Sequence, residues 1–127
     1  MYVYIHDRVW QQADEKQCQR LELLTEQIEQ GDRLLFGLLF SPRYPYWVKR
    51  LRISWRLLAK VITIENEQIL CITHLLDRGR REYAEFLKNR QAWGEQHMHL
   101  DEGELQTWLA QRQAIQPQLP LPRLPDG

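Results

Sequence analysis

The chain has 127 residues, of which 43% are hydrophobic and 27% are charged, and its 17 Lys and Arg residues are balanced by 17 Asp and Glu residues. This composition is typical of one globular domain. It excludes a protein that is basic as a whole, and the most apolar segment, residues 34–40, is too short to span a membrane. Two isolated cysteines and the absence of a secretory signal over residues 1–10 predict a cytoplasmic protein without a structural metal or a cofactor.

The first third of the chain predicts a strand followed by helix. Residues 2–5 (YVYI) have the composition of a β-strand. Between Asp7, a candidate N-cap, and Gly31, a candidate stop, apolar residues return every three to five positions, which predicts one helix or two short helices. Residues 34–40 (LLFGLLF) fit a short helix or an extended segment, and two prolines predict a loop over residues 41–46.

A row of cations marks the next segment. From Lys49 to Leu57 the arginines fall on one parity and the apolar residues on the other, so a strand here would bury one face and present a basic one. No acidic residue lies between Asp32 and Glu65. Because a guanidinium group donates two parallel hydrogen bonds and keeps its charge, the pattern indicates a phosphate-binding surface. The alternative is a basic face that is merely solvated.

Two apolar runs follow the cations. Residues 57–64 and 68–76 flank the short polar break Glu65-Asn66-Glu67, which predicts a β-hairpin. His74 lies inside the second run, and we interpret it as a core histidine rather than as an acid or base.

Turns and helices are predicted for the last third. Gly79 lies in a basic turn, and the apolar spacing after it predicts a helix that begins near Arg80. Asp101 is a candidate N-cap for a last short helix over residues 102–113. Prolines alternate with leucines over residues 116–127, which predicts an extended or disordered tail.

Four central segments together resemble the RelE/ParE superfamily of small bacterial toxins. They are WRLLAKV (residues 55–61), ENE (65–67), the apolar run over 68–74 and RGRREY (78–83). The resemblance implies an α+β fold, with a small antiparallel sheet of about four strands, N-terminal helices packed on one face and an added C-terminal helix. It divides the chain into a toxin-like domain (residues 1–100), an accessory helix (101–114) and a proline-rich flexible tail (115–127).

The resemblance also implies a function. Such a protein would be a metal-independent endoribonuclease that cleaves messenger RNA in the ribosome and that an antitoxin protein holds inactive in a hetero-oligomer. Cleavage would proceed by attack of a ribose 2′-hydroxyl on the adjacent phosphate. The implied catalytic positions are Lys49, Arg56, Arg78, Arg80 and Tyr83. The implied RNA-binding positions are Arg50, Arg52, Lys60, Arg81, Tyr46 and Trp47.

Each catalytic position has an implied role. Arg56 would hold the phosphate, and Lys49 with Arg50 or Arg52 would add positive charge beside it. The leaving oxygen would be assisted by Arg78 or Arg80. Tyr83 would be a base or a stacking platform, and Tyr44, Tyr46 and Trp47 would stack on unpaired bases.

Two other classes of function stay open. One is a noncatalytic binding module of the same fold, for instance an inhibitor of a DNA topoisomerase such as gyrase. The other is an interaction protein whose tryptophans and proline-rich tail contact partners. A ribonuclease would need Arg80 and Tyr83 and would survive deletion of residues 116–127, whereas an interaction protein of this kind would not survive the deletion.

Overall fold

The computed structural model describes residues 1–31 and 46–115. The predictions for residues 34–40, for the loop up to residue 45 and for the tail from residue 116 lie outside them. The described strands are β1 (Tyr2–Ile5), β2 (Tyr46–Arg50), β3 (Trp55–Ile64) and β4 (Glu67–Asp77). The described helices are α1 (Asp7–Gln12), α2 (Glu15–Glu29), α3 (Arg81–Lys88), α4 (Arg90–His97) and α5 (Glu102–Ile115).

The strands form one sheet in the order β1-β4-β3-β2. The β2–β3 and β3–β4 pairs are antiparallel, whereas β1 runs parallel to β4. The predicted α+β class is therefore confirmed, but the sheet is mixed and not antiparallel throughout. After β1 the chain passes through α1 and α2 before it re-enters the sheet, and such a crossover lets two neighbouring strands run in the same direction.

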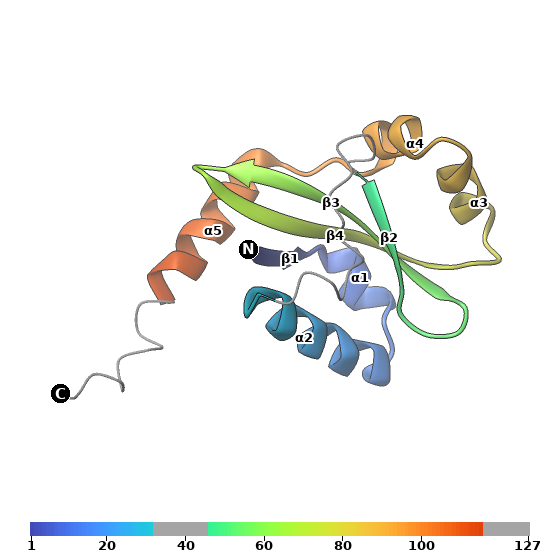
Figure 1. Ribbon diagram of the computed structural model, residues 1–127, viewed down its shortest axis with the longest axis horizontal. Coiled ribbons are helices and arrows are strands. Elements are labelled where there is room, and N and C mark those ends of the chain that lie inside the picture. Colours follow the sequence, from blue (N-terminus) through green and yellow to red (C-terminus); the bar gives the residue numbers. More distant parts are fainter. Residues whose placement is uncertain (32–45, 116–127) are drawn as a thin grey trace.

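Helices α1 and α2 pack on one side of the sheet, which we call the α2 face (Figure 1). The region from Asp7 to Gly31 thus forms two helices, one of the two arrangements that the sequence left open. The N-cap of α1 is His6 and not Asp7, because the His6 ring accepts the backbone N–H of Arg8. The α2-face core contains Val3, Ile5, Val9, Leu21, Leu24, Ile28, Leu51, Leu57, Ala59, Leu70, Ile72 and Leu75.

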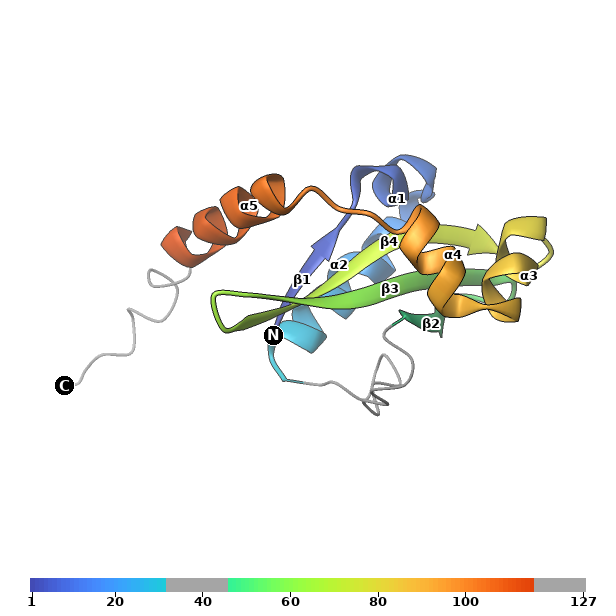
Figure 2. The same ribbon diagram turned by 90° about the horizontal axis from the view of Figure 1, so that it is seen from above.

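The opposite side, the α4 face, is covered at its two ends by different helices (Figure 2). At one end α3 and α4 cover Tyr46, Leu58 and Leu76, and at the other end α5 covers Ile64, Ile69 and Cys71. The predicted C-terminal helix is confirmed, with Asp101 Oδ1 accepting the backbone N–H of Glu104 at 3.0 Å.

Helix α5 is fastened to the start of the chain. The ring of Trp108 lies edge-on to Tyr4 at 5.3 Å between ring centroids. Glu29, at the end of α2, accepts the backbone N–H of Val3 at 2.9 Å and pairs through its other oxygen with Arg112 of α5. One carboxylate therefore joins β1, α2 and α5.

Two hairpins order the central strands. The β3–β4 hairpin is confirmed, and its turn residues Glu65 and Asn66 have φ angles of 51° and 68°, as tight hairpin turns require. The prediction of one strand from Lys49 to Leu57 is wrong. That segment is a second hairpin, in which β2 ends at Arg50, β3 begins at Trp55 and the backbone N–H of residue 51 donates to Trp55 O at 2.9 Å.

Candidate functional site

The two central arginines of the basic segment lie side by side. Arg50 of β2 and Arg56 of β3 are register partners, and their neighbours two residues further along, Val48 and Leu58, pack in the α4-face core. Because side chains alternate along a strand, Arg50 and Arg56 also project from the α4 face. Both lie at the sheet end that carries α3.

Arg56 holds the β2–β3 turn with one of its nitrogens. Its Nη1 lies 3.4 Å from Arg52 O, 3.3 Å from Ile53 O and 3.0 Å from Trp55 O. Within residues 1–31 and 46–115, Nη2 and Nε make no hydrogen bond. Three N–H groups of this guanidinium thus remain for a ligand while the turn fixes where they point.

A second basic turn lies directly beside the first. The backbone N–H of Arg78 donates to Ser54 O at 2.6 Å, and that of Gly79 donates to Asp77 Oδ1 at 2.8 Å. The predicted start of a helix near Arg80 is confirmed, since this residue is the N-cap of α3. The two turns therefore bring Arg52, Arg56, Arg78 and Arg80 to one end of the sheet.

The side chains of this second turn are held only loosely. Arg80 Nη2 lies 3.3 Å from Glu82 Oε1, and Arg81 Nε lies 3.8 Å from Glu85 Oε2. All four side chains are largely exposed, and exposed ion pairs contribute little free energy. A phosphate could displace these carboxylates at small cost.

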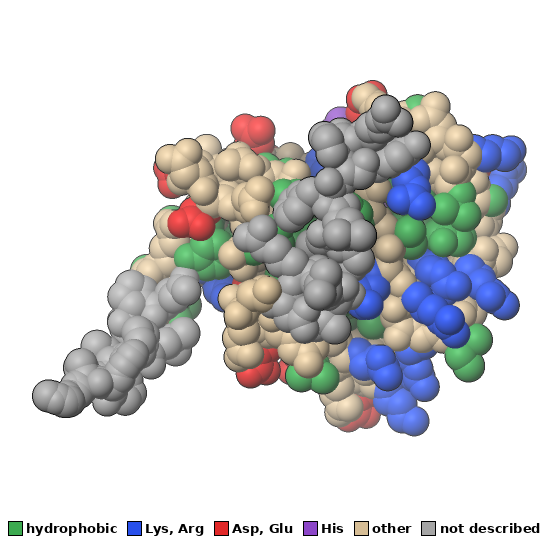
Figure 3. Space-filling view, viewed as in Figure 1, with side chains coloured by type: hydrophobic (Ala, Val, Ile, Leu, Met, Phe, Trp, Pro, Cys, Tyr) green, Lys and Arg blue, Asp and Glu red, His purple; other side chains and the backbone are tan. Residues whose placement is uncertain are grey.

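Positive side chains gather at this end of the molecule (Figure 3). Blue atoms cover the part that holds the β2–β3 turn and α3, whereas red atoms gather over the end that holds α5 and along α2. We call the surface formed by Arg50, Arg52, Arg56, Arg78 and Arg80 the arginine surface. It is a local basic patch on a chain of zero formal net charge.

Tyr83 lies on the same side of the sheet as the arginine surface. It is half-buried on α3 and packs against the cluster that contains Leu58 and Leu76. Leu76, a member of this cluster, is the register partner of Arg56. The structure thus places Arg56, Arg80 and Tyr83 in one region.

Other predicted site residues lie elsewhere. Tyr46 is 9% exposed and packs under α4, so the prediction that it stacks on bases is wrong: the core takes up its ring. Trp47 packs against the α2-face core. Lys49 also lies on the α2 face, which separates it from Arg56, whereas Arg50 is the neighbour of Arg56 on the α4 face.

Lys60 lies on the α4 face but at a distance from the arginine surface. It is four residues beyond Arg56 on β3, which is about 13 Å along a strand. Burial lowers its pKa, and its register partners are Tyr46 and Cys71. Because its ammonium group is half-buried beside Cys71, Lys60 is poorly placed to share a phosphate with Arg56.

Two hollows flank the arginine surface, and neither was predicted. The first, of about 230 Å³, is lined by Asp14, Gln17, Arg52, Ile53, Ser54 and Trp55. The second, of about 340 Å³, lies between α2 and the edge strand β2 and is lined by Arg20, Leu23, Leu24, Gln27, Lys49, Arg50 and Leu51. Sequence spacing could not reveal them because each combines α2 with a strand or turn that is distant in the chain.

Over residues 1–31 and 46–115, no group of three or more His, Cys, Asp or Glu side chains is arranged to hold a metal ion. No helix in these ranges is both long and apolar enough to cross a bilayer.

Comparison with known proteins gives one structural likeness to report. No protein-family model matches the chain, and no curated protein matches it. A solved structure, the YoeB/ParE toxin from Agrobacterium tumefaciens, is similar with a TM-score of 0.42 and 18% sequence identity, over 61% of this chain and 98% of that chain. This likeness concerns the course of the chain, and the chemistry must come from the residues themselves.

Proposed function

We propose that the chain is a toxin that binds single-stranded RNA on the arginine surface and cleaves it without a metal ion. One observation carries the proposal: Arg50 and Arg56 project as register partners from the face on which Tyr83 packs, beside the turn that holds Arg80. Such a group offers several fixed positive charges to one phosphate and an aromatic hydroxyl beside it.

The proposed reaction is a transfer within the RNA strand. The ribose 2′-hydroxyl would pass its proton to the Tyr83 hydroxyl, which acts as the base and releases its own proton to water. The 2′-oxygen forms a bond to phosphorus, the bond from phosphorus to the 5′-oxygen breaks, and the products are a 2′,3′-cyclic phosphate and a 5′-hydroxyl end. Arg56, whose Nη2 and Nε make no hydrogen bond within the described residues, would hold the phosphate oxygens. Arg78 or Arg80 would stabilise charge on the leaving oxygen, with water supplying its proton, because arginine does not give up a proton in proteins.

Recognition of the bases would use a different residue from those predicted. Trp55 packs against the α2-face core, on the side of the sheet opposite to Arg56, but it is half-exposed and lines a hollow together with Arg52 of the arginine surface and Ser54. An aromatic side chain next to a phosphate-binding arginine can stack on an unpaired base. We therefore propose Trp55, in place of Tyr46, as the stacking platform.

The partner that we propose is an acidic antitoxin segment. Among the described residues that line the hollow between α2 and β2 there are three cations, Arg20, Lys49 and Arg50, and no carboxylate, and Leu23 on its wall is 53% exposed. Apolar anchors and acidic side chains of a partner would suit this groove. A segment bound there would also engage Arg50, so it would compete with RNA at the edge of the arginine surface.

The same groove supports a second candidate function, a noncatalytic module that only binds an acidic protein. The two candidates differ in what Arg56 and Tyr83 do. In a nuclease both residues act on RNA, whereas in a binding module the partner contacts Arg20 and Lys49 on the other face.

Induction of the chain in a bacterial host tests the choice. We expect growth arrest with new messenger RNA ends that carry 5′-hydroxyl groups, and loss of both effects in Arg56→Lys and in Tyr83→Phe. Lys16→Ala, which removes an exposed cation of α2 that is not one of the five residues of the arginine surface, is the matched control and should arrest growth like the wild type. Arrest with intact transcripts in every variant would refute the nuclease and favour the binding module.

A further inference from the structure

A second cationic site lies where β1 gives way to α1. The β1–β4 pairing ends at Ile5 and Ile72, and the β3–β4 register then shifts, so that Leu58 faces His74 and Thr73 is bulged out. Beyond Ile72 the neighbour of β4 is helix α1, which takes the place that β1 has before it. Arg8, in the first turn of α1, therefore reaches past the sheet edge to His74, whose ring lies on the α4 face under Trp93.

Two histidine rings hold the Arg8 guanidinium. Its Nη1 lies 3.1 Å from His74 Nε2, its Nε lies 3.2 Å from His6 Nδ1 and its Nη2 lies 3.3 Å from His6 Nε2. We call Arg8, His6 and His74 the Arg8 cluster. It was not predicted from the sequence, because Arg8 and His74 are 66 positions apart.

The hydrogen bonds fix the protonation state of His74. Arginine only donates, so His74 Nε2 accepts and the ring proton is on Nδ1, which donates to Thr73 Oγ1 at 2.9 Å. The Thr73 hydroxyl in turn donates to Leu58 O at 3.4 Å. His74 is therefore neutral, in agreement with a pKa that burial first, and then the charge of Arg8, lowers to about 4.

The cluster holds a positive charge without a direct negative partner. Within residues 1–31 and 46–115, no carboxylate forms an ion pair with Arg8, and its histidine partners are uncharged acceptors. Asp7 and Glu104 act on His6 from further away, and the His97 ring lies tilted against Trp93 at 4.5 Å between ring centroids. A half-buried guanidinium usually has an anionic partner, because taking it from water is costly.

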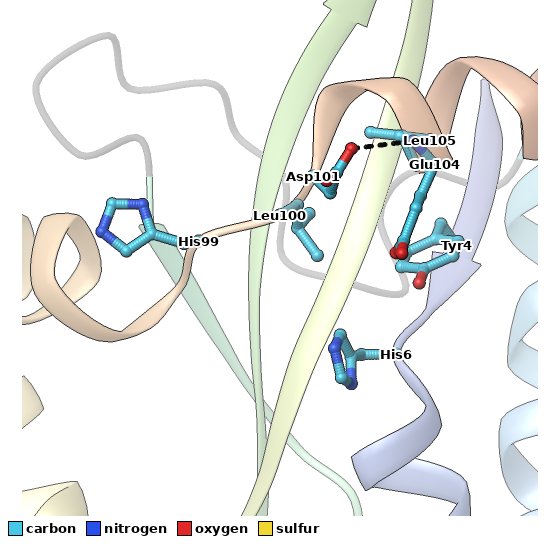
Figure 4. Close-up of a pocket in the computed structure, with 7 residues that line it drawn as sticks. All are labelled: Tyr4, His6, His99, Leu100, Asp101, Glu104 and Leu105. Carbon is cyan, nitrogen blue, oxygen red and sulfur yellow. Dashed lines mark hydrogen bonds between the residues drawn. The ribbon is translucent and has the colours of Figure 1, made fainter.

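A hollow of about 210 Å³ reaches His6 from the side of α5 (Figure 4). Tyr4 and Leu105 form part of its wall, Asp101 is occupied with the backbone of Glu104, and His99 points away from the other lining residues. The His6 ring therefore lines the hollow and also contacts the Arg8 guanidinium. The carboxylate of Glu104 in this wall favours a small anion held on the arginine side over a large polyanion that fills the hollow.

From this arrangement we propose that the Arg8 cluster binds a phosphate-type oxyanion, with Arg8 as its fixed charge and His6 as a hydrogen-bond donor. The oxyanion replaces His6 Nδ1 as the acceptor of the Arg8 Nε–H group and accepts from Nη2 as well, so it receives the forked pair of hydrogen bonds that arginine gives to phosphate. It also favours the protonated form of His6. The ligand class is a free phosphate or a terminal phosphate group, and this site is separate from the arginine surface.

Titration of the intact chain with inorganic phosphate and with sulfate, followed through imidazole NMR signals, tests the proposal. We expect saturable shifts of His6 and His74 with both anions, and affinity for sulfate that rises as pH falls, because bound anion raises the pKa of His6. Sulfate is included because phosphate itself gains and loses a proton in this pH range, which would obscure the pH dependence that comes from His6. Sodium chloride at matched ionic strength should produce no saturable shift.

Three variants make the test specific. Arg8→Gln should weaken both anions about tenfold or more, since it removes a charged donor pair. His6→Asn keeps an N-cap acceptor for α1 and should weaken binding while the helix content stays unchanged. Lys16→Gln, which removes an exposed cation of α2, is the control and should bind as the wild type does.

Single-stranded RNA with and without a 5′-phosphate distinguishes the sources of the oxyanion. Displacement of sulfate only by the phosphorylated strand would assign the site to a terminal phosphate, whereas displacement by neither strand would assign it to a small free anion. Saturable shifts that persist in Arg8→Gln, or no saturable shift with either anion, would overturn the proposal.

Discussion

The arginine surface and the Arg8 cluster both reach the α4 face, but they hold their guanidinium groups in opposite ways. Arg50 and Arg78 are exposed, and Arg80 pairs with the exposed carboxylate of Glu82. Arg8, in contrast, is half-buried and is hydrogen-bonded to two neutral imidazole rings. Exposed charges attract a polyanion at a distance and are weakened by salt. A half-buried charge acts over a short range and is screened less, so it can select a small ligand by geometry.

The largest effect on stability should come from removing Trp93, the side chain that covers His74 of the Arg8 cluster. Trp93 is 7% exposed and contacts the rings of His74 and Phe86 edge-on, at 5.1 and 5.7 Å. Trp93→Ala should lower the free energy of unfolding by about 3–5 kcal/mol, measured in urea, because it leaves a cavity under α4. The pKa of His74 should rise in the same variant. Leu87→Ala, at a residue that is 48% exposed, should change stability by about 0.5 kcal/mol or less.

Acid should weaken the fold through His74. Its pKa falls from 6.5 to about 4, chiefly by burial, so between these values the unfolded chain binds a proton that the folded chain does not. Stability is therefore lost as pH falls through this window, by about 1–3 kcal/mol for this group. Urea unfolding across the window measures the loss. His74→Gln, which keeps an acceptor for Arg8, should reduce it, and an unchanged pH profile would contradict the assignment.

Arg56→Lys should separate charge from geometry on the arginine surface. Lysine keeps the charge but cannot donate to the three turn carbonyls and to phosphate in the same way. We expect a loss of stability of about 1 kcal/mol and a loss of RNA affinity of about tenfold, measured by fluorescence anisotropy. Arg52→Lys, at an exposed position of the same turn, should leave stability unchanged. Equal behaviour of the two variants would show that the turn bonds of Arg56 are dispensable.

The smallest effect on the fold is expected at Arg80. Its ion pair with Glu82 is exposed, so Arg80→Ala should change the free energy of unfolding by about 0.5 kcal/mol or less. RNA affinity should fall for all sequences alike, and its logarithmic salt dependence should become shallower by about 0.7, the value for one phosphate contact on a single strand. The same salt titration of Lys16→Ala should match the wild type.

Sequence patterns were enough to predict those turns and helix starts that depend on a residue at the boundary itself. Asn66 between two apolar runs marked the β3–β4 hairpin, Gly79 marked the turn before α3, and Asp101 marked the start of α5. In each case a turn or capping residue stands at the boundary of a periodic segment. The basic surface could be predicted as well, since the cations are close together in the chain.

Tertiary contacts decided the rest. The alternation from Lys49 to Leu57 contains no Gly or Pro, so nothing local marks the turn that Arg56 and the Arg78–Ser54 hydrogen bond hold in place. Helix α4 was not predicted because Gly94 and polar residues weaken its pattern. There the glycine is needed for packing, because a Cβ at this position would overlap the Tyr46 ring.

The carboxylate of Glu29 has a kinetic consequence. It connects residues that are 83 positions apart, so its pair with Arg112 can form only after β1, α2 and the sheet have come together. Contacts that span so much chain are costly to close and usually form late in folding. Replacing Arg112 should therefore speed the detachment of α5 and the unfolding of the chain, and leave the rate of folding almost unchanged.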